Sequence, residues 1–214
     1  MKTFFRNLAS CMFVAFVMLS ACSSAPSVKF PRDLAFPVHI SKVFHADTAF
    51  NESERGVLSA VISQINSQTN GVANLEIQFD LDWKEGPIED LENMERNANQ
   101  IVKIGSGAPI VTLMDNVSSS HAVTLGYCKV NFDVPRALTK VYIIYDRINN
   151  TSALFHVAMH EILHSLRMKH VKDSKSIMFS TTAQQNVTLC MNYTDMKEFC
   201  RVNRCNADLL GYCE

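Results

Sequence analysis

The chain has 214 residues, of which 47% are hydrophobic and 19% are charged, and its formal net charge is −1. This length supports one domain with a substantial core and is too short for two comfortable domains. The near balance of charges gives no sign of a nucleic-acid partner. We expect a single folded domain, residues 38–214, that acts as a monomer.

The first 21 residues are typical of an export signal rather than of a folded segment. A basic start precedes the apolar stretch Leu8–Leu19, which is shorter than the roughly 20 residues that a membrane span needs. The segment ends in the letters LSAC, which resemble a bacterial lipobox and imply that Cys22 is lipidated. Residues 22–37 would then tether the protein to the bacterial cell envelope, at the outer membrane or the cell surface. An ordinary secretory signal, which would give a secreted protein, is the alternative.

Hydrophobic periodicity predicts that the folded domain begins with a strand, a helix and a strand. Phe36–Phe44 alternates as a half-buried strand does. Asn51–Asn70 carries apolar residues at helical spacing, and an Asn-Gly pair ends it. Leu75–Phe79 is the second strand. The following segment, residues 80–100, is acidic, but its carboxylates lack the spacing of calcium loops, so we expect a solvated surface.

Several short strands follow, and together with the first two they predict a mixed sheet in an α/β (α+β) domain. One of them is a continuous apolar run, which is typical of a strand that is buried on both faces. The predicted strands are Ile101–Ile104, Pro109–Met114, Ala122–Val130 and, as the apolar run, Val141–Asp146.

The predicted helix Ala153–Leu166 contains the letters HEILH. Because His160 and His164 are four residues apart, they project from the same helix face. Two imidazoles in this arrangement can bind one zinc ion at about 2.0–2.1 Å each. Glu161 lies one step round the helix, where it could take a proton from a water molecule at the metal.

A third histidine follows the helix. His170 can join the other two only if the helix ends near residues 166–168 and the chain turns back. Three neutral imidazoles with an open fourth position make a catalytic zinc site, whereas structural zinc sites are closed and usually contain cysteine.

The pattern HExxHxxxxxH, followed after eight residues by Ser176-Ile177-Met178, resembles the metzincins, and within them the matrixins and their bacterial relatives. The resemblance implies a metzincin-like zincin fold with an active-site helix and a small C-terminal subdomain. It implies one catalytic zinc ion, Glu161 as the general base and a Met-turn at Met178. The ligands that it implies are His160, His164 and His170.

One position departs from the family pattern. Arg167 stands where the family has a glycine that allows the bend between the helix and the third ligand. If the bend is kept, Arg167 must adopt a left-handed conformation, which costs a non-glycine residue on the order of 1–2 kcal/mol.

Leu125, Gly126 and Tyr127 resemble the edge strand that matrixins hold over the catalytic cleft. An exposed edge offers unpaired N–H and C=O groups, to which an extended peptide can add as a further strand. A protein or peptide is therefore the expected substrate.

The expected function is that of a zinc metalloendopeptidase. Zinc would polarise the scissile carbonyl, and Glu161 would pass a proton from the attacking water to the leaving amine. Two other interpretations stay open. A catalytically silent surface binding protein on the same scaffold would have no need of Glu161. An HExxH enzyme with a downstream glutamate ligand would use Glu198, but it would leave His170 and Met178 without a role.

Seven cysteines are unevenly distributed. Four of them crowd into residues 190–213, and in an exported protein they are expected to form two disulfides, for which three connectivities exist. A zinc site of four thiolates is the competing interpretation, and the absence of a CxxC pair weakens it. Cys128 is left over. The disulfide candidates are Cys190, Cys200, Cys205 and Cys213.

Overall fold

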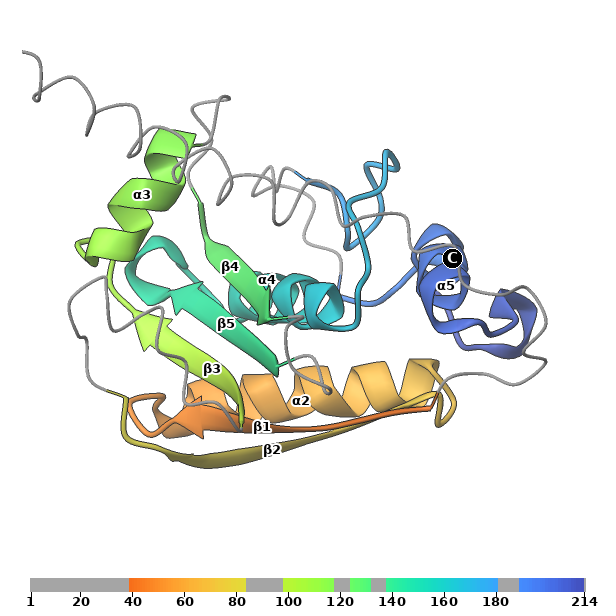
Figure 1. Ribbon diagram of the computed structural model, residues 1–214, viewed down its shortest axis with the longest axis horizontal. Coiled ribbons are helices and arrows are strands. Elements are labelled where there is room, and N and C mark those ends of the chain that lie inside the picture. The colour runs from red at the N-terminus through yellow and green to blue at the C-terminus, as the bar shows by residue number, and fades with distance from the viewer. Residues whose placement is uncertain (1–38, 84–97, 118–123, 132–137, 181–188, 214) are drawn as a thin grey trace, which may run out of the picture. The chain divides into compact units, whose positions relative to one another are not determined.

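The computed structural model describes residues 39–83, 98–117, 124–131, 138–180 and 189–213 (Figure 1). All of them belong to one compact unit, Phe36–Glu214. The leader, Cys22, the tether and most of the acidic segment lie outside the described residues. Among the helices that are described, none has the length and apolar character to cross a membrane.

The described strands form one mixed sheet of five strands in the order β2-β1-β3-β5-β4. β1 pairs in parallel with β2 and β3, and β3 pairs in parallel with β5, whereas β4 runs antiparallel to β5. This confirms the predicted mixed sheet and places β4 at one of its edges. The bounds are β1 Ile40–Asp47, β2 Ala73–Leu81, β3 Asn99–Ile104, β4 Gly126–Asn131 and β5 Leu138–Ile144.

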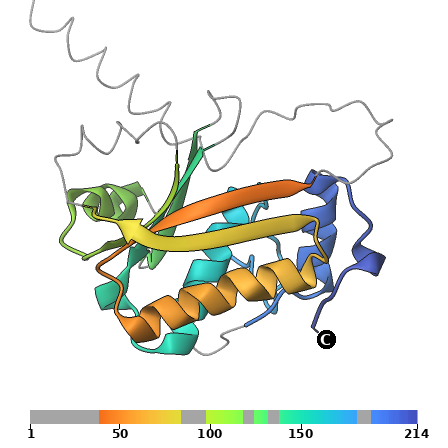
Figure 2. The ribbon, with the colours of Figure 1, turned by 90° about the horizontal axis from the view of Figure 1, so that it is seen from below.

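Two long helices cover one face of the sheet. α2, Glu52–Gln68, runs alongside β1 and β2 (Figure 2), and α4, Thr151–Ser165, contacts β4 and β5. α2 begins at Asn51, whose side chain accepts from the backbone N–H of Glu54 while the Glu54 carboxylate accepts from the Asn51 N–H. This reciprocal cap satisfies two donors that the helix itself cannot bond.

The main hydrophobic core lies between this face and the two helices. The helix α2 contributes an apolar stripe at positions three and four residues apart, as an amphipathic helix requires. Every residue of β5 is buried. Its residues 141–144 confirm the first four positions of the apolar run that predicts a buried strand, whereas Tyr145 and Asp146 lie exposed in a short 3-10 helix. The buried residues of the α2 stripe are Leu58, Val61, Ile62 and Ile65.

The prediction of a strand at Pro109–Met114 is wrong, because these residues belong to the helix α3, Pro109–Val117. A short apolar run does not by itself distinguish a strand from a helix. Proline is well suited to the first helical position, where no N–H is needed. Val111 packs with Val102 and Tyr142 in a second, smaller apolar cluster.

The C-terminal part contains α5, Tyr193–Asn203, and a short 3-10 helix, Ala207–Leu209. Two disulfides tie it, Cys190–Cys213 and Cys200–Cys205, while the buried Cys128 lies outside both. The end of α2 also contacts this part, because the Gln68 side chain accepts from the Met191 N–H at 3.1 Å.

Candidate metal centre

The helix α4 carries the first two histidines and begins at a side-chain cap. The Asn150 side chain accepts from the Ala153 N–H at 2.8 Å. Such a cap typically stabilises a helix by about 1 kcal/mol. His160 and His164 are partly buried in the last turns of the helix, one turn apart.

The helix ends in a turn that sends the chain back towards these histidines. Arg167 has φ = 71°, which confirms the predicted left-handed conformation, and its side chain is exposed. The Arg167 N–H donates to His164 O at 2.9 Å and the Met168 N–H donates to Leu163 O at 3.2 Å. These two bonds define a Schellman motif, which usually places glycine at the left-handed position.

Two distant side chains bond the remaining carbonyls at this helix end. Lys42 of β1 donates from Nζ to Ser165 O at 3.1 Å, and it also donates to Thr139 Oγ1 at 2.9 Å. Asn203 of α5 donates to Leu166 O at 3.4 Å. Burial lowers the pKa of Lys42 from 10.5 to about 8. The end of α4 is therefore fixed by the sheet and by α5 as well as by its own turn.

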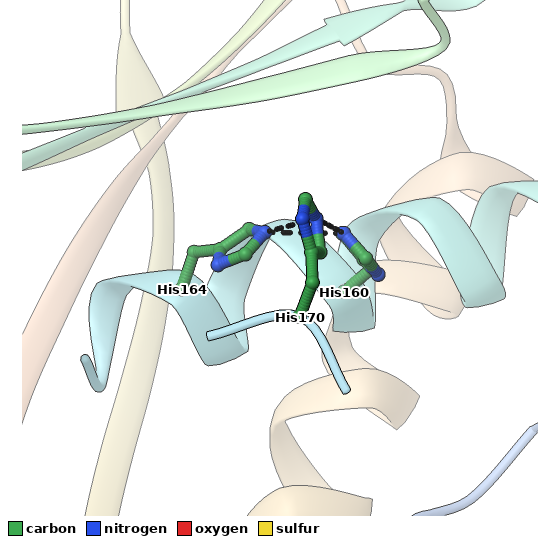
Figure 3. A group of neighbouring side chains, drawn as sticks. All are labelled: His160, His164 and His170. Atoms are coloured by element: carbon green, nitrogen blue, oxygen red, sulfur yellow. Dashed lines mark hydrogen bonds between the residues drawn. The ribbon is translucent and has the colours of Figure 1, made fainter. Parts of the chain in front are cut away.

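The turn brings His170 to the other two histidines, as Figure 3 shows. The three Nε2 atoms lie 3.1 Å apart for His160 and His164, and 3.2 Å from each of these to His170. No other group of three or more His, Cys, Asp or Glu side chains converges in this way within the described part of the chain.

The histidine tautomers follow from backbone contacts. The Nδ1–H of His160 donates to Ile177 O at 2.7 Å, and the Nδ1–H of His164 donates to Met168 O at 2.9 Å. Because a carbonyl oxygen only accepts, each Nδ1 carries the proton and each Nε2 presents a lone pair. This outer hydrogen bond is the usual support of a metal-binding imidazole.

A cation fits this donor set. Lone pairs about 3 Å apart repel one another unless a positive charge lies between them. Protons are poor candidates, because burial lowers the pKa of His160 to about 3 and that of His164 to about 4. A tetrahedral zinc ion with Zn–N distances of about 2.0–2.1 Å would separate its ligands by about 3.3 Å, close to the spacing observed here.

Glu161 is buried beside this cluster, with 8% of its surface exposed. Burial raises the pKa of its carboxyl group to about 8. A nearby cation would oppose this rise, since a positive charge favours the carboxylate. Glu161 thus has the environment in which carboxyl groups serve as acids and bases near neutral pH.

The predicted Met-turn lies against both the helix and the third histidine. Ile177 and Met178 are fully buried. The Ile177 carbonyl accepts from His160, and the Met178 carbonyl accepts at 3.0 Å from the N–H of Val171, the residue after His170. Two consecutive carbonyls of this turn therefore accept from His160 and from the residue that follows His170.

Asp195 of α5 holds the turn at Ser176, Ile177 and Met178 in place. Its carboxylate accepts from the Ile177 N–H at 3.2 Å, from the Met178 N–H at 3.3 Å and from the Ser176 hydroxyl. It also accepts from the Asn192 N–H at 2.9 Å. Burial raises the pKa of Asp195, and these hydrogen bonds oppose that rise.

Sequence reasoning missed Asp195 and Lys42. A local signal exists for each, although neither signal reveals its role. Asp195 completes a capping box with Asn192. Lys42 alternates with the buried Phe44 and Ala46, so it lies on the core face of β1.

The alternative third ligand, Glu198, is not part of the cluster. Its Oε1 accepts from the Lys169 N–H at 3.2 Å, and its carboxylate pairs with Arg201. His156 lies one turn before His160 and is buried. Its ring stacks on that of His160, with the two ring centroids 6.4 Å apart.

The predicted substrate strand lies at the edge of the sheet. Gly126 begins β4 and pairs with Ile143, and Leu125 O accepts from the Ile144 N–H at 3.0 Å. Tyr127 stacks on Tyr142 with ring centroids 6.3 Å apart. On its inner side β4 packs against α4, the helix that carries the histidines.

A mixed sheet over a helix with two histidines, and a third returning after a turn, defines a metzincin-like fold. Residues 34–201 match the sequence pattern of the family described as Matrixin. This match covers most of the chain, and the chain therefore belongs to the matrixin family. No curated protein matches it.

A solved structure of a metalloproteinase shares the fold. Metalloproteinase-II from Bacteroides fragilis has a TM-score of 0.50 and 15% sequence identity, covering 86% of this chain. This chain spans 60% of the length of that protein. Archaemetzincin (amzA) from Methanopyrus kandleri has a TM-score of 0.49 and 9% identity, covering 82% of this chain and 99% of the other.

Proposed function

We propose that this protein is a zinc-dependent endopeptidase that hydrolyses peptide bonds in proteins or peptides. The observation that carries the proposal is the convergence of three Nε2 atoms at 3.1–3.2 Å. Histidine-only ligation with an open position is typical of catalytic zinc rather than structural zinc. Membership of the matrixin family supports the same metal and the same reaction class.

In this proposal His160, His164 and His170 hold one zinc ion. When bound, zinc supplies a Lewis acid that polarises the scissile carbonyl and makes water easier to deprotonate. Glu161 accepts the proton of the attacking water and then passes it to the leaving amine. Burial raises the pKa of its carboxyl group and a bound cation would oppose that rise, so that the group can both accept and release a proton near neutral pH.

The substrate binds in this proposal as an extended strand along β4. Among the described strands β4 pairs with β5 alone, and a strand edge of this kind offers backbone donors and acceptors to an extended peptide. Gly126 lies over Glu161 at the start of this strand. A peptide paired there would pass directly above the general base, which favours an extended chain over a compact small molecule.

The test is hydrolysis of a peptide library by the purified protein, with a chelator control and with the Glu161→Gln variant. Glu161→Gln keeps the shape of the side chain and removes the base. We expect full zinc content and a kcat lower by about 10²–10⁴-fold, the usual contribution of a general base. Zinc-loaded wild-type protein that cleaves no peptide would overturn the proposal.

The ligand set has its own test. His170→Ala should lower zinc affinity by well over the roughly 10–100-fold that is typical of changes around a metal site. Glu198→Ala is the matched control and should retain zinc, because Glu198 lies outside the cluster. Full zinc in His170→Ala would remove that histidine from the ligand set.

We also propose that the protein is lipid-anchored through Cys22. The support is the lipobox-like sequence that ends at this residue. Acyl chains contribute about 0.8 kcal/mol for each buried methylene, and two or more chains give a stable anchor. The intact mass of the protein purified from membranes should show acyl groups on an N-terminal Cys22. A mature chain that starts after Cys22 and lacks them would indicate a secreted protein.

A further inference from the structure

We propose that Gly126 is a positioning residue for Glu161, because its missing side chain lets the edge strand close onto the general base. The proposal rests on the function proposed above, in which Glu161 moves the proton. It gives Gly126 a task beyond its place on the expected substrate strand.

The contact is closer than any side chain would permit. A Cβ atom at position 126 would lie 2.8 Å from Glu161 Cγ, 2.8 Å from Val157 Cγ1 and 3.1 Å from Glu161 Oε1. Both neighbours project from α4, and both are buried, with 8% of Glu161 and 5% of Val157 exposed. Protein interiors are close-packed, so an added methyl group must displace one of these two side chains or the strand.

The need for glycine here comes from space and not from backbone conformation. Gly126 is not among the described residues with positive φ, whereas Gly71 is, at 81°. Gly71 has nothing within 4 Å of its added Cβ, so the two glycines serve opposite purposes. At Gly126, an alanine could adopt the backbone angles but would not fit.

The strand cannot easily retreat to make room. Gly126 lies in a continuous antiparallel register with β5, from Gly126 opposite Ile143 to Asn131 opposite Leu138. The bond from the Ile144 N–H to Leu125 O, at 3.0 Å, fixes the residue before it. An added methyl group therefore acts mainly on the side chains of α4.

The consequence is catalytic geometry. The strand that would pair with substrate approaches the side chain that would take the proton, at Gly126, too closely to admit a Cβ atom. Their separation is set by the absence of a side chain at position 126. A displacement of about 1 Å in such a geometry can reduce the rate by about 10²-fold.

The test compares Gly126→Ala with Gly56→Ala in the full protein. Gly56 is an exposed glycine on α2 whose added Cβ would meet nothing within 4 Å, so it controls for the loss of glycine itself. We expect Gly126→Ala to keep its zinc, to lose about 10²-fold in kcat and to change KM by less than roughly threefold. Gly56→Ala should match the wild type. An unchanged kcat in Gly126→Ala would overturn the proposal.

A double-mutant cycle separates action through Glu161 from direct action on substrate. Residues that act as a unit are strongly non-additive. In a Glu161→Gln background, Gly126→Ala should lower the residual kcat by less than roughly threefold. An equal loss in both backgrounds would mean that Gly126 contacts the substrate itself, and the positioning role would be wrong.

Two further measurements keep the proposal open to refutation. If Gly126→Ala does not fold, adding Val157→Ala removes one of the two close contacts and leaves Glu161 as the nearest obstacle, so the same loss of kcat is expected. If the wild type proves inactive, the proposed function fails, and a crystal structure of Gly126→Ala still tests the contact. It should show the Glu161 carboxylate displaced relative to the three histidines, and an unmoved carboxylate would refute the role.

Discussion

His160 and His164 lie one turn apart on the same helix, yet their Nδ1–H groups donate to carbonyls in two different turns of the chain. His164 donates to Met168 O, a carbonyl four residues away that the Schellman turn fixes. His160 donates to Ile177 O, in a separate turn that Asp195 holds from α5. His164 is supported by its own stretch of chain, and His160 depends on a carboxylate 35 positions further on.

The orientation of the His164 ring therefore has a local cause, whereas that of the His160 ring has a long-range cause. The support of His164 forms together with the end of α4. The support of His160 needs the C-terminal helix to be docked, because the buried carboxylate of Asp195 accepts from the Ile177 N–H and from the Ser176 hydroxyl. We therefore expect changes in the two supports to affect the metal centre in different ways.

The largest effect should come from breaking the local support with Arg167→Pro. Proline fixes φ near −65°, whereas Arg167 has φ = 71°. It also removes the N–H that donates to His164 O. We expect the variant to lose zinc and to be destabilised by about 3 kcal/mol or more, as seen by metal analysis and thermal unfolding.

Arg167→Gly is the matched control, because glycine adopts positive φ without cost. Relief of strain, on the order of 1–2 kcal/mol, opposes the greater freedom of the unfolded chain, about 0.4–1 kcal/mol. Zinc and activity should be kept, with equal or slightly higher stability. If zinc is kept and activity is lost, the exposed arginine side chain has a role of its own, most simply in contacting substrate.

A smaller effect should follow from breaking the remote support with Asp195→Ala. The buried Ile177 N–H and the Ser176 hydroxyl would lose their acceptor, at about 1–3 kcal/mol for each unsatisfied group, whereas the Met178 N–H keeps Ser176 Oγ at 2.8 Å. Because Ile177 O then loses its fixed position, zinc affinity should fall by about 10–100-fold, as for other outer supports of metal ligands.

Isothermal titration with zinc, together with denaturant unfolding of the zinc-free protein, would measure both changes for Asp195→Ala. Asp208→Ala is the control, since Asp208 is an exposed carboxylate on the same C-terminal part that accepts from the Tyr193 hydroxyl. Zinc affinity equal to that of the wild type in Asp195→Ala would show that His160 needs no support from the Met-turn.

The sequence predicts the local part of this centre well, because short-range geometry determines it. A spacing of four residues on a helix places His160 and His164 together, and the position of His170 requires a reversal of the chain. That reversal assigns a left-handed conformation to Arg167, which the structure has. The strand-helix-strand start and the edge position of β4 follow in the same way from periodicity and resemblance.

The long-range part could not be predicted, for identifiable reasons. Asp195 shows a capping signal in the sequence, but nothing local indicates that its second set of contacts is the turn at Ser176–Met178. The run Pro109–Met114 satisfies both a buried strand and a buried helix, and tertiary packing decides between them. Which of the three disulfide pairings forms depends on the fold, and the structure has Cys190–Cys213 and Cys200–Cys205.

The smallest expected effect concerns Lys42, the third support of this helix end, and it depends on pH. Burial lowers the pKa of Lys42 from 10.5 to about 8 in the folded protein. Between these values the unfolded chain binds a proton that the folded chain does not. Stability contributed by this difference is therefore present above pH 10.5 and is lost as pH falls through about 8.

Lys42→Met isolates this contribution, because the methionine keeps an unbranched apolar stem and does not titrate. We expect the stability of the wild type relative to Lys42→Met to rise by on the order of 1–2 kcal/mol from pH 7.5 to 10.5, since the ammonium group is partly screened by solvent. Denaturant unfolding of both proteins at several pH values would measure the difference, and the pH dependence of zinc binding largely cancels between them. If the stability difference between the two proteins does not change with pH over this range, Lys42 stays charged in the folded protein and donates to Ser165 O as an ammonium group throughout.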